Sequence, residues 1–532
     1  MKILVCDPVS SKGIALLQQR PEFEVVVLQK RLPEAELLPV VKDVVAMVVR
    51  SETKVTAKVI AAAPLLRVVG RAGVGVDNVD VEAATQRGVV VMNTPGGNTI
   101  STAELSFAMI LNLARKVPQA FASMAAGKWD RKQFQGAELS GKVLGVLGLG
   151  RIGSEVARRA VAFGMRVVAY DPFLTEERAR ALGIELAGDL DDVYRDADFI
   201  TIHMPVTEQT RGMLNAAAFA RMKPKVCIVN CARGEIVVEN DLLAALDSGK
   251  VAAAALDVFA AEPLPAEHPF RKHPGITLTP HLGASTHEAQ EKCGIEVAEV
   301  IAGYLLTGEV RNAVNLPYLD AKTYEEVKPY LVLGEKLGKL LAQLAPPQVD
   351  RIHITYGGKA QELPNIDPVT RAVLLGFLSH SSVKDLNNVN VRSIASTLGL
   401  TVEEKRSTEP VTFNEWLHVQ IFHAGEKVIS AGGTFFGSPD NPRIVRLFSQ
   451  PTEITPSGVV LLLKNKDRPG IVGYLGTLMA RHKVNIASMS LSRDTAGGHA
   501  LTVLNLDSVP PPEALDEIQR DPDISNVKVV KL

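Results

Sequence analysis

Residues 141–171 read GKVLGVLGLGRIGSEVARRAVAFGMRVVAYD, and this stretch decides the fold that we expect for the chain. It opens with an apolar run, Val143–Leu147, that is typical of a buried parallel strand. A glycine-rich turn and a helical pattern follow, and a second strand, Arg166–Tyr170, leads to Asp171. A lone GxGxxG motif is a weak indication, but strand, turn, helix, strand and acidic residue in this order predict a dinucleotide-binding unit.

Each glycine of the turn has a different expected task. Gly148 permits the tight turn, Gly150 lets the backbone approach a pyrophosphate, and Gly153 lets the helix pack on the strand. The helix N-terminus favours the anion because its first N–H groups are unpaired. Asp171 is expected to accept hydrogen bonds from ribose hydroxyls and to repel a 2′-phosphate, so the cofactor is predicted to be NAD. The alternative is an α/β turn that binds no nucleotide.

The length of the chain and its alternation of strands and helices predict four domains. A chain of 532 residues is too long for one hydrophobic core. The fold class is therefore α/β, with two doubly wound parallel sheets followed by an α+β intervening domain and a ferredoxin-like βαββαβ domain. The expected limits are 1–94 plus 282–314 for a flavodoxin-like substrate-binding domain, 95–281 for the Rossmann domain, 315–452 for the intervening domain and 453–532 for the last domain.

Composition excludes several classes of protein. The net charge is −1 and no long basic block occurs, so we expect neither nucleic-acid nor acidic-lipid binding. No apolar run reaches membrane-spanning length, and Met1 leads directly into a strand, so no signal peptide is expected. Cys227 and Cys231 lack a second ligand pair. We therefore expect no metal site and a reduced, cytoplasmic protein.

Polar clusters follow three strands that we expect in the Rossmann sheet, and they contain Arg233, Glu262 and His281. Because the carboxyl ends of parallel strands meet at one crevice, these residues should face each other. Arg233 can grip a carboxylate, His281 can take a hydroxyl proton, and Glu262 can hold the second imidazole nitrogen. Singly, Glu262 could be a turn residue and His281 a helix cap. His203 also follows a strand, but a buried structural role is favoured for it.

Two strands of the first domain end in cations. Arg50 and Ser51 follow one strand, and Arg71 with Gly73 follows another. Their place beyond the carboxyl ends of a parallel sheet is suited to holding an anion. Two solvated surface arginines are the alternative explanation.

The last domain offers a second candidate binding site. Asp467 and Asn485 fall at a loop and a strand start that we expect this fold to bring together. Such groups could bind the amine and the carboxylate of an amino acid. An ordinary loop cap is the alternative.

Four motifs, VLGLGRIG, NCARGE, LDVFAAEP and TPHLGAST, resemble those of the NAD-dependent D-2-hydroxyacid dehydrogenase family. VVRSETKVT, GRAGVGVDNVD and the four-part layout are similar to the long-form phosphoglycerate dehydrogenases of that family, which carry an intervening domain and a C-terminal ACT domain. The resemblance implies oxidation of 3-phospho-D-glycerate to 3-phosphohydroxypyruvate with NAD, the first step of the phosphorylated route to serine. It also implies a homo-oligomer, either a dimer or a tetramer.

The resemblance further implies a role for individual residues in catalysis and cofactor binding. Arg233, Glu262 and His281 would be catalytic, with His281 as the general base. Asp257 would accept a hydrogen bond from the nicotinamide amide. The implied cofactor contacts are Gly148, Gly150, Arg151, Ile152, Gly153, Asp171, Cys231, Ala232, Arg233, Asp257, His281, Gly283 and Ala284.

The implied substrate contacts come from the first domain and from a second subunit. Arg50 and Arg71 would bind the phosphate or the carboxylate, with Ser51 and Gly73 beside them, and Arg131 would reach across from a partner subunit. In the ACT domain the resemblance makes the following residues candidates for binding L-serine, as a feedback inhibitor, between paired domains: Asn465, Asp467 and Asn485.

Two other functions fit parts of these observations. A reductase of glyoxylate, hydroxypyruvate or another small 2-keto acid would share the catalytic trio but would not need Arg50 and Arg71. A nucleotide-sensing interaction protein could retain the trio without catalysis. Such proteins typically end in flexible tails, so the two folded domains that we expect after residue 314 favour an enzyme.

Overall fold

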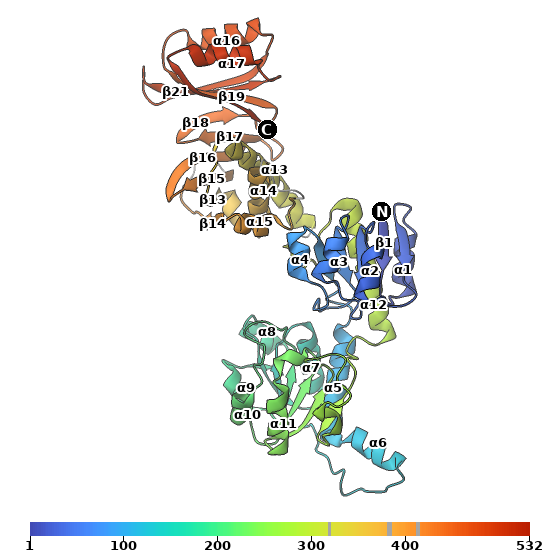
Figure 1. Ribbon diagram of the computed structural model, residues 1–532. Coiled ribbons are helices and arrows are strands. Elements are labelled where there is room, and N and C mark those ends of the chain that lie inside the picture. The colour runs from blue at the N-terminus through green and yellow to red at the C-terminus, as the bar shows by residue number, and fades with distance from the viewer. Residues whose placement is uncertain (318–320, 380–385, 411–414) are drawn as a thin grey trace.

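The computed structural model describes residues 1–317, 321–379, 386–410 and 415–532, and it contains four β-sheets. The nucleotide-binding sheet lies at one end of an elongated molecule, the N-terminal sheet follows, and the two C-terminal sheets form the other end (Figure 1). The predicted fold class is confirmed: two doubly wound parallel sheets precede a mixed sheet and an antiparallel sheet.

The first sheet is parallel and has the strand order β2-β1-β3-β4-β5, which is the flavodoxin-like order. Its strands are β1 (Lys2–Val5), β2 (Glu24–Val27), β3 (Ala46–Val49), β4 (Val68–Arg71) and β5 (Val90–Asn93). The helices between them are α1 (Ser11–Gln18), α2 (Glu34–Val40), α3 (Ala57–Ala62) and α4 (Val81–Gln86).

Helix α12 (His287–Thr307) comes from far along the chain and packs on this first sheet. A Cβ on Gly70 of β4 would lie 2.5 Å from a methyl carbon of Ile301, so the strand and the helix are in close contact. Val297 and Ile301 are buried in the same core as the strand residues Val5 and Val68. The chain thus leaves the N-terminal domain and returns to it.

The second sheet is also parallel, with the order β12-β11-β10-β9-β6-β7-β8. The strand order reverses between β6 and β9, and from this switch point β6 to β8 and β9 to β12 run outward in opposite directions. Its strands are β6 (Val143–Leu147), β7 (Arg166–Tyr170), β8 (Glu185–Leu186), β9 (Phe199–Ile202), β10 (Val226–Asn230), β11 (Val251–Leu256) and β12 (Ile276–Leu278). Its helices are α5 (Thr99–Arg115), α7 (Arg151–Ala162), α8 (Glu176–Ala181), α9 (Leu190–Asp196), α10 (Ala216–Arg221) and α11 (Glu239–Asp247).

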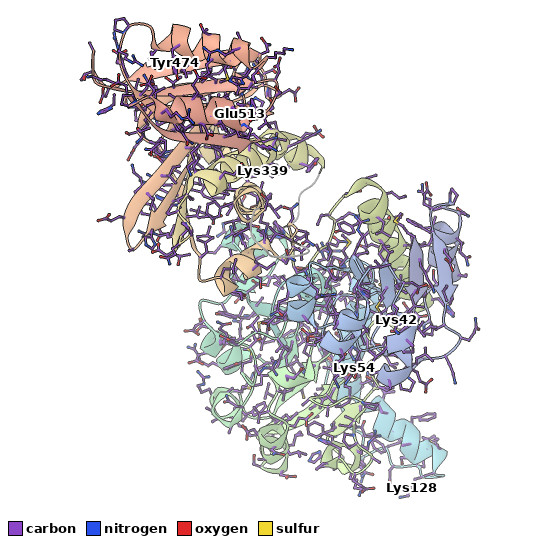
Figure 2. The ribbon with its side chains drawn as sticks, turned by 45° about the horizontal axis from the view of Figure 1, so that its top comes forward. Lys42, Lys54, Lys128, Lys339, Tyr474 and Glu513 are labelled. Carbon is purple, nitrogen blue, oxygen red and sulfur yellow. The ribbon has the colours of Figure 1, made fainter. Side chains whose placement is uncertain are left out.

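An arm formed by α6 (Val117–Ala125) and the loop to residue 136 projects from this domain (Figure 1). Lys128 marks its far end in Figure 2. None of the residues of α6 is buried, although Phe121 and Met124 are apolar, and Trp129 in the loop is 76% exposed. Lys116 adopts a left-handed conformation and separates α6 from α5.

The third sheet is mixed and has the order β14-β13-β15-β16-β17-β18, with the helices α13, α14 and α15 in the same domain. The strands are β13 (Arg351–Gly358), β14 (Thr401–Arg406), β15 (Glu415–His423), β16 (Glu426–Phe435), β17 (Pro442–Leu447) and β18 (Gln450–Ile454). The helices are α13 (Ala321–Leu344), α14 (Asp367–Leu378) and α15 (Val391–Thr397). The expected domain limit at residue 452 falls inside β18.

The last domain has the predicted β-α-β-β-α-β order and forms an antiparallel sheet, β20-β21-β19-β22. Its elements are β19 (Val459–Lys466), α16 (Ile471–Arg481), β20 (Ile486–Arg493), β21 (His499–Leu506), α17 (Pro512–Arg520) and β22 (Ile524–Lys531). One face of the sheet lies under its own helices, and the other face shares a hydrophobic core with the third sheet through Val460, Leu462 and Val503. The two C-terminal domains are therefore packed together.

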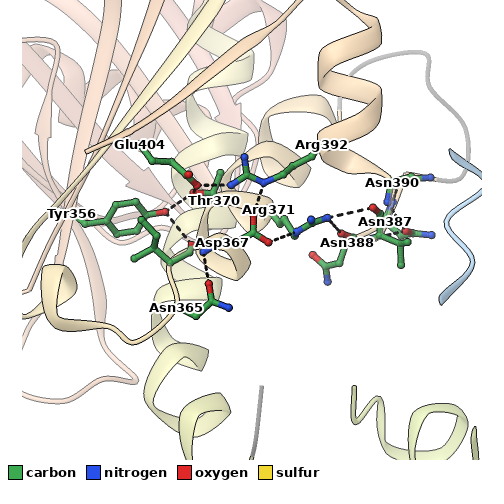
Figure 3. A network of polar contacts seen from close by, with 12 residues as sticks. Tyr356, Asn365, Asp367, Thr370, Arg371, Asn387, Asn388, Asn390, Arg392 and Glu404 are labelled. Carbon is green, nitrogen blue, oxygen red and sulfur yellow. Dashed lines mark hydrogen bonds and ion pairs between the residues drawn. The ribbon is translucent and has the colours of Figure 1, made fainter. Parts of the chain in front are cut away.

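A polar network joins these C-terminal domains to the first sheet (Figure 3). Arg371 on α14 bonds both Asp367 and the carbonyl oxygen of Asn388. The Asn387 side chain donates to the carbonyl oxygen of Gly88, which lies between α4 and β5, at 3.1 Å. Asn387 therefore links the intervening domain to the N-terminal domain.

Candidate active site

Arg233, Glu262 and His281 follow β10, β11 and β12, and the structure brings all three to the carboxyl edge of the second sheet. The sequence repeats a parallel strand followed by a polar loop, and neighbouring parallel strands place these loops side by side. This placement agrees with the prediction that the three side chains face one crevice. Their chemical roles remain a prediction.

His281 and Glu262 form a close pair, with Nδ1 of His281 2.7 Å from Oε2 of Glu262. The other carboxylate oxygen accepts a hydrogen bond from the backbone N–H of Phe259. Burial alone would raise the pKa of the Glu262 carboxyl. The hydrogen bond with His281 and the nearby positive charge of Arg233 outweigh burial and lower this pKa. An ionised carboxylate can only accept, so Nδ1 of His281 is the donor and Nε2 is left free to act as a base.

Asp257 holds the loop that carries His281. It is fully buried, and its carboxylate accepts hydrogen bonds from the Thr279 hydroxyl and from the backbone N–H groups of Leu282 and Gly283. Burial raises its pKa, while these three hydrogen bonds act in the opposite direction. The family resemblance implies that Asp257 accepts a hydrogen bond from the nicotinamide amide. Its carboxylate already accepts three hydrogen bonds from this loop, so the contact with the cofactor remains a prediction.

A cationic cavity of about 840 Å³ opens beside the His281–Glu262 pair. Arg50 follows β3 and Arg71 ends β4, and both side chains line this cavity. These are the two arginines that the sequence suggested for binding an anion. Nε of Arg71 is buried and has no hydrogen-bond partner in the described part of the chain. Burial and the neighbouring charge of Arg233 lower the pKa of Arg71 to about 10, although the Asp77 carboxylate acts in the opposite direction, so this guanidinium remains charged at neutral pH.

Three other cations line this cavity and were not predicted from the sequence: Arg31, Lys54 and Arg271. Arg31 lies beyond the carboxyl end of β2, so the strand-end rule that selected Arg50 could have selected it as well. Lys54 follows Ser51 by three positions, and no motif distinguishes it from a surface lysine. The backbone here is fixed by Asp7, whose carboxylate accepts from the N–H groups of Arg50 and Thr53.

The second cavity, of about 530 Å³, lies beside the glycine-rich turn and is called here the glycine-loop cavity. Arg151, Ile152, Cys231, Ala232, Gly283 and Ala284 line it, and it shares Arg71 and His281 with the cationic cavity. A ligand that spans both cavities would therefore pass His281. Asn98 was missed by the sequence analysis; it also lines this cavity, and its buried side-chain oxygen has no partner among the described residues.

The glycine-rich turn fits a dinucleotide. Gly148 has a positive φ of 92°, and a Cβ on Gly153 would lie 2.1 Å from the Gly148 carbonyl oxygen. A Cβ on Gly150 would meet nothing within 4 Å, and no side chain caps the N-terminus of α7 there. The Asp171 carboxylate accepts from the Leu149 and Phe173 N–H groups, which leaves lone pairs for ribose hydroxyls. The residues present therefore suit NAD.

His203 lines the glycine-loop cavity as a half-buried side chain. Its Nε2 lies 3.0 Å from the Thr201 hydroxyl, and burial lowers its pKa to about 3. The structural role favoured from the sequence remains a prediction. Arg131, by contrast, is exposed on the arm and lines neither cavity of its own chain.

The polar residues expected to bind an amino acid in the last domain do not come together within one chain, and that expectation was wrong. Strand register aligns Ile486 with Leu506 and Val459, whereas Arg493 aligns with Ala500 and Asn465. Asp467 and Asn485 therefore lie at opposite ends of the sheet, about 20 Å apart at the usual rise per strand residue.

Each of these polar side chains already has partners in its own domain. Asn465 is 1% exposed and accepts from the Thr502 hydroxyl. Asp467 accepts from Arg493, and Asn485 donates to Asp507. A site that uses both ends would need residues from two copies of the domain.

The described residues contain no group of three or more histidine, cysteine, aspartate or glutamate residues that could hold a metal ion. No helix within them is long and apolar enough to cross a membrane. All four cysteines of the chain are free thiols.

Comparisons with known families match three parts of the chain. Residues 107–283 match the NAD binding domain of D-isomer specific 2-hydroxyacid dehydrogenases. Residues 326–448 match the D-3-phosphoglycerate dehydrogenase intervening domain, and residues 459–523 match the ACT domain.

Similar proteins extend over the whole length. The chain is 42% identical to the D-3-phosphoglycerate dehydrogenase of Archaeoglobus fulgidus, with all of both chains covered. It is 39% identical to that of Bacillus subtilis, with 100% of this chain and 99% of the relative covered. Among solved structures, the NAD-dependent formate dehydrogenase of Staphylococcus aureus in complex with NAD has a TM-score of 0.54 at 28% identity, covering 59% of this chain and 98% of that one.

Proposed function

Because this chain belongs to the D-3-phosphoglycerate dehydrogenases, within the NAD-dependent D-2-hydroxyacid dehydrogenase family, we propose that it oxidises 3-phospho-D-glycerate to 3-phosphohydroxypyruvate. This reaction is the first step of the phosphorylated route to L-serine. The observation that carries the proposal is the crevice in which the His281–Glu262 pair, Arg233 and the cationic cavity meet.

The residues of the crevice have separate tasks in this reaction. Arg233 binds the substrate carboxylate and fixes the position of C2. Arg50 and Arg71 bind the phosphate at the other end of the molecule, which accounts for the concentration of positive charge in the cationic cavity. Arg31 and Lys54 add to this charge. The substrate therefore lies with its 2-hydroxyl near His281.

His281 moves the proton. Nε2 accepts it from the 2-hydroxyl, and the imidazolium that forms is stabilised by Glu262 through Nδ1–H. Bound NAD supplies the hydride acceptor. The loop held by Asp257 keeps His281 in place. The Gly150 backbone at the N-terminus of α7 would hold the cofactor pyrophosphate, with Gly148 and Gly153 shaping the turn.

NADH formation from 3-phosphoglycerate, compared with unphosphorylated D-glycerate, tests this function. We expect a strong preference for the phosphorylated acid, because the cationic cavity binds its phosphate. Equal turnover of both acids, or a preference for reducing glyoxylate, would instead favour a reductase of small 2-keto acids. Absence of turnover with intact NAD binding would favour a nucleotide-sensing interaction protein.

We further propose that the protein is a homo-oligomer, a dimer or a tetramer, that L-serine regulates. The exposed apolar residues of the arm, Phe121, Met124 and Trp129, support a second subunit, and Arg131 on this arm would reach the partner's substrate. An ACT domain supports an amino-acid effector, and Asn465, Asp467 and Asn485 are the candidates to bind it. The four free thiols support a cytoplasmic location.

A further inference from the structure

Asp77 contacts Arg233 across the crevice. It follows β4 in the substrate-side domain, whereas Arg233 follows β10 in the nucleotide-side domain. Nε of Arg233 lies 2.9 Å from Oδ2 of Asp77 and donates to it. Both residues line the glycine-loop cavity, so this ion pair lies at the place where the cofactor and the substrate carboxylate would meet.

The Arg233 guanidinium is held at two of its edges. Besides the bond to Asp77, Nη1 donates to the Ala232 carbonyl oxygen at 2.6 Å. Nη2 rests against Gly75, where a Cβ would lie only 1.6 Å away, so no side chain would fit between them. Two of the five N–H donors are thus used within the described residues, and the others remain for a carboxylate.

Asp77 itself is fixed by its neighbour. The Asn78 side chain donates to the carbonyl oxygens of Arg50 and Thr53, at 2.7 and 2.6 Å. The same short segment therefore contacts both anion-binding elements, the backbone beside Arg50 and the side chain of Arg233. A shift of this segment would move the two elements together.

The pair contributes little to stability, because the Asp77 side chain is 65% exposed. Its effect is one of orientation and of local charge. Without Asp77, Nε of Arg233 would lose its acceptor, and the guanidinium could turn away from the neighbouring positive charge of Arg71. A small displacement of a group that orients a substrate lowers the rate strongly.

We propose that Asp77 is a positioning residue that holds the Arg233 guanidinium toward the substrate carboxylate from the opposite wall of the crevice. The inference rests on the proposed function, because it requires a substrate carboxylate at Arg233. It adds a residue that neither the motifs nor the family resemblance had identified.

The first test compares the steady-state kinetics of Asp77→Ala, Asp77→Asn and the control Glu82→Gln. Asp77→Ala should raise KM for 3-phosphoglycerate and lower kcat/KM about 10- to 100-fold, with NADH affinity changed less than twofold. Asp77→Asn keeps an oxygen acceptor for Nε–H and should recover most of the loss. Glu82 is an exposed acid of α4, so its variant removes the same charge without touching Arg233. Equal losses for Asp77→Ala and Glu82→Gln would overturn the proposal.

A double-mutant cycle tests whether Asp77 acts through Arg233. In an Arg233→Lys background the Nε–H donor is absent, so adding Asp77→Ala should lower kcat/KM by less than twofold. If the two substitutions lower kcat/KM independently, Asp77 does not position Arg233.

Oxalate separates this inference from the proposed function, because it carries a carboxylate and needs no turnover. Titration of the enzyme–NADH complex, followed by NADH fluorescence, should show weaker oxalate binding to Asp77→Ala than to the unaltered protein. Failure of 3-phosphoglycerate turnover would defeat the proposed function but leave this comparison intact. Equal oxalate affinities, or no oxalate binding by the unaltered protein, would overturn the role of Asp77.

Discussion

The crevice around His281 is assembled within one chain, whereas the polar residues of the ACT domain are divided between two ends of its sheet. His281 and Glu262 lie 2.7 Å apart although they are 19 residues apart in sequence. Asp467 and Asn485 are 18 residues apart in sequence and lie at opposite ends of β20. Glu262 and His281 both follow strands of a parallel sheet, and all these strands end at the same edge. Strands β19 and β20 also run in one direction, because both pair antiparallel with β21, so Asp467 after the end of β19 and Asn485 before the start of β20 lie at opposite edges.

This difference has a consequence for function. The proposed catalytic residues all come from one chain, and only the proposed contact of Arg131 would need a partner subunit. A serine site that combines Asp467 with Asn485 needs a second chain, as an isologous contact between two copies would provide. Catalysis and regulation should therefore respond differently to substitution and to dissociation of subunits.

The largest effect should come from removing the general base. His281→Ala should lower kcat by about 10²- to 10⁴-fold, because proton transfer by a positioned side chain contributes this much. NADH binding, measured by fluorescence titration, should stay within twofold of the unaltered value. A near-normal kcat would show that His281 is not the general base, and the proposed role of this crevice in catalysis would then be wrong.

Loss of one cavity arginine should have the next largest effect. Arg71→Ala removes charge-assisted hydrogen bonds worth about 1.5–3 kcal/mol, so kcat/KM for 3-phosphoglycerate should fall roughly 10- to 150-fold. D-glycerate, which lacks the phosphate, should be affected much less. Arg20→Ala removes an exposed arginine of the same domain and serves as the control. An equal loss for both acids would place Arg71 at the carboxylate instead.

The same contrast explains what could be read from the sequence. Arg233, Glu262 and His281 were predictable because a glycine-rich turn identifies a parallel sheet, and the carboxyl ends of its strands define one crevice. Asp77 was not, because the motif that contains it, GRAGVGVDNVD, does not show that it contacts Arg233 across the crevice. The separation of Asp467 from Asn485 was missed although the order implies it: a β-α-β unit joins two parallel strands, so the end of β19 and the start of β20 lie at opposite edges. Strand β14 reads TVEEKR and carries four charged residues, so it has no apolar pattern that would indicate a buried strand.

His203, which lines the glycine-loop cavity, should make the stability of the protein depend on pH. Its pKa of about 3 lies below the ordinary value of 6.5, so the unfolded chain binds one more proton than the folded chain between these values. Stability should therefore fall as pH drops below about 6.5, by up to about 1.4 kcal/mol per pH unit from this group. His203→Gln should lower stability at pH 8 but reduce this slope, measured by urea unfolding between pH 8 and 5. An unchanged slope would mean that His203 is already protonated in the folded state.

The smallest effect on the uninhibited rate is expected in the ACT domain, and it tests the division of that site. Asp467→Ala and Asn485→Ala should each leave kcat within about twofold when serine is absent, because neither residue is near the crevice. Each should abolish inhibition by L-serine, since each removes one end of a site shared by two copies. Hybrid oligomers of the two variants combine one unaltered Asp467 end with one unaltered Asn485 end. They should therefore recover part of the inhibition, while each variant alone shows none. Recovery would require that the two ends meet across subunits, whereas its absence, or inhibition that survives either substitution, would place the effector within a single domain or elsewhere in the chain.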